Sequence, residues 1–169
     1  TTLIGHSAGS GATMTGGNNI AVGYASGNAL TSGSENTFVG VEAGDGISTA
    51  SSNTGIGFRS LSAAAGASNT ALGIQTGLLL TGSENVLIGN VAGSAFTDAD
   101  QNVAVGSGAL LTDVKGDGSV AVGTSALQSQ SFSSVTTTGN TALGHKAGKF
   151  VSTGQNNTFV GHEAGEGIT

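Results

Sequence analysis

The chain has 169 residues, of which 31 are glycine, none is proline or cysteine, and only 8% are charged. Without cysteine it can form neither a disulfide nor a thiolate metal site. A net charge of −6 with only four basic residues disfavours nucleic acid and anionic membranes as partners. No apolar run approaches the roughly 18 residues of a membrane span, so we expect no membrane insertion by this segment.

One five-residue pattern recurs along the whole chain. It is written NTFVG at residues 36–40 and 157–161, and NTALG at 69–73 and 140–144. The ten copies are spaced 16 to 18 residues apart, except for a spacing of 21 before the ninth, and they end at glycines 5, 23, 40, 57, 73, 89, 106, 123, 144 and 161. A period held this closely predicts a repeat architecture. We therefore expect residues 1–169 to form one β-solenoid domain of ten repeats, each of about 17 residues.

We number each repeat, or rung, from its Asn (position one) to its Gly (position five). Position two is β-branched in all ten rungs and position four is always aliphatic, which predicts short strands at residues 2–4, 20–22, 37–39, 54–56, 70–72, 86–88, 103–105, 120–122, 141–143 and 158–160. Positions two and four share one face of a strand. We expect this face to line the interior of the coil, and we expect parallel stacking to make a rod roughly 48 Å long.

Position three is never polar, so the strands are apolar on both faces. Such strands are usually buried on both faces. We expect position three to face outward and another chain to cover it, which predicts an oligomer. The alternative is that these small residues lie harmlessly on the surface.

The repeat also fixes polar and glycine positions. Stacked Asn side chains at position one can bond from rung to rung, and Gly at position five suits a bend with positive φ. The residues that we expect to carry the repeat are Asn36, Val39, Gly40, Asn69, Leu72, Gly73, Asn102, Val105, Gly106, Asn140, Leu143 and Gly144. Positions six to nine are interpreted as a second short strand, followed by an apolar residue at position twelve and a polar return loop.

These residues resemble the head repeats of trimeric autotransporter adhesins of the YadA-like type, whose unit is a stretch of the Asn-Ser-Val-Ala-Ile-Gly kind. The stretches at 102–106 (NVAVG) and 119–123 (SVAVG) are the most similar. The period of about 17 residues, rather than about 14, resembles repeats of phage tail fibres. The resemblance implies a parallel β-roll wound left-handed and assembled as an intertwined or side-by-side homotrimer. Periodicity alone shows neither the hand nor the number three.

The sequence supports three other functions less well. Stretches such as IGHSAG at 4–9 and LGHKAG at 143–148 fit the hexapeptide pattern of left-handed β-helix acyltransferases, but only one hexad in three fits. An ice-binding face needs a regular outward array of threonines, whereas position two mixes Thr with Val and Ile and is expected to point inward. No acid–base or nucleophile constellation stands out, so we expect no enzyme and no cofactor.

All three histidines lie at position six, and His145 and His162 belong to adjacent rungs. Histidines stacked in this way are weak candidates for a transition-metal site; the simpler interpretation is a tolerant surface position. Asp98, Asp100, Asp113 and Asp117 lack the spacing of a calcium loop and are expected to be solvated.

The 21-residue spacing places extra residues at 128–139. We expect them to bulge outward as a loop, since insertions in repeat proteins map to one face that is often the binding face. Phe132 and Val135 are the candidate contact residues.

Together these patterns predict a structural and adhesive segment of an extracellular trimeric fibre. The function favoured is host attachment by a phage tail fibre, and the alternative is the head of a bacterial trimeric adhesin. The expected partners are two further copies of the chain and a cell-surface receptor such as a glycan. The chain starts and stops within the pattern, without the atypical end repeats of a solenoid, so we expect it to be part of a longer fibre.

Overall fold

A computed structural model describes residues 1–11 and 13–168 and contains β-strands but no helix among them. Ten strands of three residues each, one per rung, form a single parallel sheet. They are β1 (Thr2–Ile4), β2 (Ile20–Val22), β3 (Thr37–Val39), β4 (Thr54–Ile56), β5 (Thr70–Leu72), β6 (Val86–Ile88), β7 (Val103–Val105), β9 (Val120–Val122), β11 (Thr141–Leu143) and β12 (Thr158–Val160). The predicted β-solenoid is therefore confirmed, with the strand at positions two to four of each rung in place.

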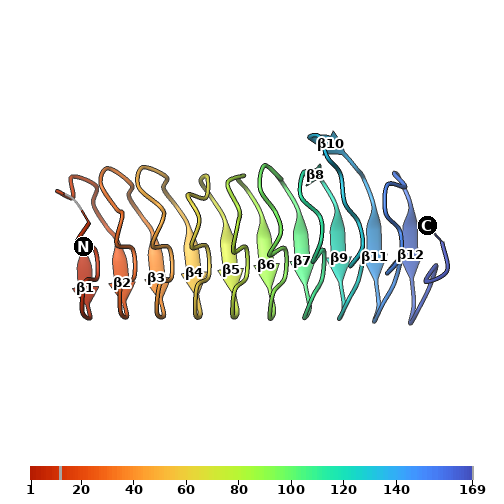
Figure 1. The fold of residues 1–169 in the computed structure, drawn as a ribbon, viewed down its shortest axis with the longest axis horizontal. Coiled ribbons are helices and arrows are strands. Elements are labelled where there is room, and N and C mark those ends of the chain that lie inside the picture. The colour runs from red at the N-terminus through yellow and green to blue at the C-terminus, as the bar shows by residue number, and fades with distance from the viewer. Residues whose placement is uncertain (12, 169) are drawn as a thin grey trace.

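The rungs are stacked in exact sequence order, with the N-terminus at one end of the rod and the C-terminus at the other (Figure 1). Each strand pairs position for position with the next, as Thr37 does with Thr54 and Phe38 with Gly55. A second sheet of two short parallel strands, β8 (Gly116–Asp117) and β10 (Thr136–Thr137), joins two return loops beside the main sheet.

The interior of the coil is lined by position three, which corrects the expectation that positions two and four would line it. Position three is fully buried in the eight rungs from the second to the ninth and nearly so in the tenth, as Ala21, Phe38, Gly55, Ala71, Leu87, Ala104, Ala121, Ala142 and Phe159. Positions two and four are half-buried or exposed in every rung. Val39, Leu72, Val105 and Leu143, which we assigned to the interior, thus face outward.

Side-chain size explains why position three faces inward. The interior of one rung is narrow, and the largest position-three residues stand next to small ones: Phe38 lies between Ala21 and Gly55, and Leu87 lies between Ala71 and Ala104. The ring of Phe38 lies above Gly55 of the next rung, where an added Cβ would meet the ring at 3.2 Å. A closely packed interior needs side chains whose sizes fit one another from rung to rung. Position three varies in size from Gly to Phe, whereas positions two and four do not.

Position twelve completes the interior, as predicted, with Leu30, Ile47, Leu80, Phe96 and Val151 buried. The rungs whose position twelve is Ala64, Asp113 or Gln130 carry Leu61, Leu110 or Leu127 at position nine instead of glycine, and all three leucines are fully buried. A leucine from position nine therefore replaces the aliphatic side chain that position twelve does not supply.

Positions six to nine form a turn rather than the second strand that we expected. In the fifth rung the backbone takes positive φ at Gly73, Gln75 and Gly77, with values of 142°, 52° and 59°. Residues other than glycine rarely adopt this region. Gln75 does so here because the neighbouring rung supplies a partner: its amide donates to the Phe58 carbonyl at 2.8 Å. The Arg59 amide donates in the same way to the Val41 carbonyl at 3.0 Å.

The Asn ladder at position one is confirmed, and seven of its eight asparagines are buried. In six of them the backbone amide donates to the side-chain Oδ1 of the Asn one rung earlier, for example Asn36 to Asn19 at 3.0 Å and Asn69 to Asn53 at 2.9 Å. The Asn side-chain amide donates in turn to a return-loop carbonyl, as Asn69 does to Gly82 at 2.9 Å. The ladder therefore ties the strands to the return loops along the rod.

Candidate interaction face

The outward side of the main sheet, which we call the sheet face, carries an aliphatic side chain at position four of every rung beside a mixture of apolar and polar residues. It consists of positions two, four and six of the rungs. Its large apolar members with side chains at least one-third exposed are Ile4, Ile20, Tyr24, Val41, Ile56, Phe58, Leu72, Ile74, Val86, Val120, Leu143 and Val160. Position six, which we did not assign to this surface, is exposed in all ten rungs and extends it beyond the strands.

No Lys, Arg, Asp or Glu occupies any of these three positions in any rung. The charged residues lie on the turns and return loops instead. At position seven, for example, Arg59 Nε lies 3.0 Å from Glu42 Oε2 of the neighbouring rung. Exposed ion pairs of this kind contribute little to stability. The sheet face therefore lacks Lys, Arg, Asp and Glu along the rod and has an aliphatic side chain at position four of every rung, although Thr at position two and polar residues at position six interrupt the apolar surface. Large exposed apolar patches of this kind mark interaction sites.

The threonines of position two point outward, contrary to our expectation. They do not form the regular array that an ice-binding face needs, because Val86, Val103 and Val120 interrupt the row in three successive rungs. The exposed Tyr24 and Phe58 at position six also make the surface uneven.

His145 and His162 lie side by side on the edge of the sheet face, as their spacing predicts. Their rings are stacked, with centroids 5.0 Å apart and planes 16° from parallel. The third histidine, His6, stacks in the same way on Tyr24 at 5.5 Å and has no second imidazole beside it.

The extra residues before the ninth rung are only partly a protruding loop. The strand β10 lies beyond the return loops of the neighbouring rungs (Figure 1) and pairs with β8. Val135 is 54% exposed and remains a candidate contact residue, whereas Phe132 is only 6% exposed. The assignment of Phe132 to the surface is therefore wrong: its side chain is buried, and its backbone lies beside Asp113, which belongs to a buried polar cluster.

This cluster lies at position twelve of the seventh and eighth rungs, beside their apolar interior. Asp113 is fully buried and accepts hydrogen bonds from Gln130 Nε2 at 2.5 Å and from the Gly116 amide at 3.1 Å. Gln130 Oε1 accepts from Asn140 Nδ2 at 2.8 Å, next to the rung in which Ser119 stands in place of the ladder Asn. Gln130 thus supplies the amide that the ladder lacks at that rung. Asp113, expected to be solvated, is instead part of the interior.

Burial raises the pKa of Asp113 above its usual 3.8, although its hydrogen bonds with Gln130 and Gly116 favour the ionised form. The Asp113 carboxyl therefore binds a proton more tightly in the folded state than in the unfolded state. As pH rises from about 4 through the raised pKa, the contribution of Asp113 to the unfolding free energy falls. We expect the Asp113→Asn variant to lose this part of the pH dependence.

Urea unfolding of the native chain and of Asp113→Asn is measured at pH 4 and at pH 7. The difference in unfolding free energy between the two proteins is then compared between the two pH values. The variant should gain stability relative to the native chain between pH 4 and pH 7. A difference that stays constant, or changes in the opposite direction, would contradict the raised pKa.

Comparison of the chain with protein-family models, with curated proteins and with solved structures found no match. None of the described residues forms a helix long and apolar enough to cross a membrane.

Proposed function

We propose that the chain is a structural and adhesive segment of an extracellular fibre in which three copies pack through the sheet face. The observation that carries this proposal is the row of half-buried or exposed aliphatic side chains at position four of every rung, on a face that has no Lys, Arg, Asp or Glu. The row repeats at each step of about 4.8 Å, so an identical chain in register offers it a matching repeat. Among the residues that the structure describes, no other element buries this face.

The number three and the fibre come from the resemblance to adhesin head repeats and phage fibre repeats, together with the rod shape. The spacing of about 17 residues favours a phage tail fibre over a bacterial adhesin head. In such a fibre the segment acts as a stiff spacer, and three copies of each outward loop, including Val135, are presented to a receptor on the host surface. Threefold presentation strengthens weak contacts with surface glycans through avidity.

The assembly is tested by sedimentation equilibrium of the native chain and of two variants. Leu72 lies on the sheet face and Gln75 lies on the turn beside it, outside the face. We expect the native chain and Gln75→Asp to sediment as three chains. We expect Leu72→Asp to sediment as one, because each interface would bury an unpaired charge.

A monomeric native chain at micromolar concentration would overturn the proposed assembly, and a dimer would overturn its threefold form. If Gln75→Asp also failed to assemble, an added charge outside the sheet face would be enough to separate the chains. The effect of Leu72→Asp would then no longer identify the sheet face as the contact between chains. The adhesive role is measured with the same proteins: a panel of immobilised bacterial surface glycans should retain the trimers more strongly than Leu72→Asp.

A further inference from the structure

The last two rungs bring three metal-binding side chains together beside the sheet face. These are His145 and His162 at position six and Glu163 at position seven. One ligand atom from each residue lies within 4.8 Å of the other two. No other group of three such residues is present in the part of the chain that the structure describes. Two imidazoles and a carboxylate are a ligand set that Zn²⁺ and other divalent transition metals favour.

We propose that His145, His162 and Glu163 form a binding site for a divalent transition-metal ion that joins the ninth and tenth rungs. The proposal rests on this geometry alone and does not depend on the trimer.

The two imidazoles are already in a suitable arrangement. Their rings are stacked with centroids 5.0 Å apart, and one ring nitrogen of each lies within 4.8 Å of the other. With metal–ligand bonds of about 2.0–2.1 Å, two ligands of one ion are at most about 4.2 Å apart. His162 Nδ1 and Glu163 Oε2, which are 3.8 Å apart, already meet that limit, and no separation within the group exceeds 4.8 Å. The His162 side chain is 69% exposed, so it can close the remaining excess by a small rotation.

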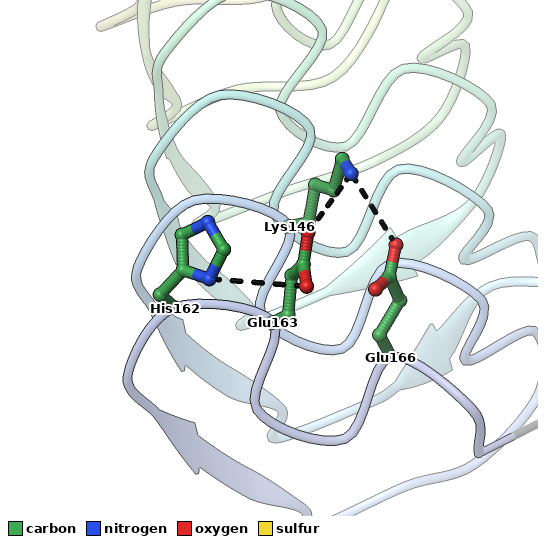
Figure 2. Close-up of polar contacts among 4 residues, drawn as sticks. All are labelled: Lys146, His162, Glu163 and Glu166. Carbon is green, nitrogen blue, oxygen red and sulfur yellow. Dashed lines mark hydrogen bonds and ion pairs between the residues drawn. The ribbon is translucent and has the colours of Figure 1, made fainter.

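The carboxylate of Glu163 is oriented by its neighbours (Figure 2). Lys146 Nζ contacts its Oε1 at 3.0 Å, and its Oε2 lies 3.8 Å from His162 Nδ1. The hydrogen bond from Lys146 holds the pKa of Glu163 below its usual value, so the carboxylate is ionised at neutral pH. Lys146 Nζ also lies 3.6 Å from Glu166 Oε1. Because Lys146 contacts Oε1 of Glu163, the other oxygen, Oε2, is left on the side of His162.

The remaining histidine provides an internal control. His6 occupies the same repeat position and also stacks on an aromatic ring, but its neighbour is Tyr24. A metal ion bound merely by an exposed position-six histidine would use His6 as well. An ion that needs His145, His162 and Glu163 together would bind only at the last two rungs.

The test is isothermal titration of the chain with ZnCl₂, together with the visible absorption of bound Co²⁺ as a measure of coordination. We expect one saturable site per chain. His145→Ala and His162→Ala should each weaken binding at least about tenfold, since the loss of an outer-shell partner alone commonly costs this much. Glu163→Gln should weaken it to a smaller extent, and His6→Ala should leave it unchanged.

All four side chains are exposed, so the variants should keep the circular dichroism spectrum and melting temperature of the native chain. The proposal is overturned if the native chain shows no saturable Zn²⁺ binding. It is also overturned if His145→Ala binds as tightly as the native chain, or if His6→Ala removes the site.

Discussion

Replacing Leu87 by Asp should unfold the central rungs of the solenoid. Leu87 is fully buried at position three of the sixth rung. The variant removes an interior aliphatic side chain, which alone costs about 2–5 kcal/mol, and places an unpaired charge among apolar neighbours. We expect the unfolding free energy to fall by at least about 4 kcal/mol. Urea unfolding followed by circular dichroism measures this loss.

The matched control is Ile88→Asp, one residue further along the same strand. Ile88 is only half-buried and lies on the sheet face. In protein dilute enough that assembly adds no stability, this variant should unfold within about 1 kcal/mol of the native chain. At higher concentration it should fail to assemble. If the two variants were equally unstable, or if Ile88→Asp were the less stable, the assignment of position three to the interior would be refuted.

Replacing Gly40 by Ala should also destabilise the stack strongly. Gly40 has a φ of 137°, in a region that is essentially restricted to glycine, and an added Cβ would collide with the backbone carbonyl of Gly57 in the next rung. The conformation alone costs a residue with a side chain about 1–3 kcal/mol. Because the spacing between rungs is fixed by the strand hydrogen bonds, the carbonyl cannot move away. We therefore expect a loss of about 3 kcal/mol or more in thermal unfolding.

Gly17→Ala is the control for this variant. An added Cβ at Gly17 meets nothing within 4 Å, and its φ lies outside the restricted region. We expect a change of no more than about 0.5 kcal/mol. Similar melting temperatures for the two alanine variants would show that the position-five glycine is not required for close stacking.

The period of the sequence was sufficient to place the strands, the rung order and the Asn ladder. It was not sufficient to decide which strand face lies inside. Hydrophobicity could not distinguish Val39 from Phe38, because both faces are apolar. The useful signal was variation in size: position three ranges from Gly55 to Phe38, as an interior of fixed volume requires, whereas positions two and four are uniform in size.

The turn at positions six to nine could not be predicted from residue preference. Residues such as Glu42, Arg59 and Gln75 rarely adopt positive φ, and they do so here because the adjacent rung offers a carbonyl to each of their amides. The sequence also contained no sign that Gln130 bonds to Asp113 and Asn140. These residues become its neighbours only when the rungs stack. By contrast, the pairing of His145 with His162 follows directly from the period, and only the contribution of Glu163 required the structure.

The strict one-to-one pairing of successive strands has a mechanical consequence. Each rung is bonded only to the rung before it and the rung after it, so a chain pulled from its two ends yields one rung at a time. Every such event releases about 17 residues, or roughly 55–60 Å of extended chain. Under load the rungs are therefore expected to unfold one after another, in steps of similar length. An unfolded rung can then refold against the strand of the neighbouring rung that is still folded.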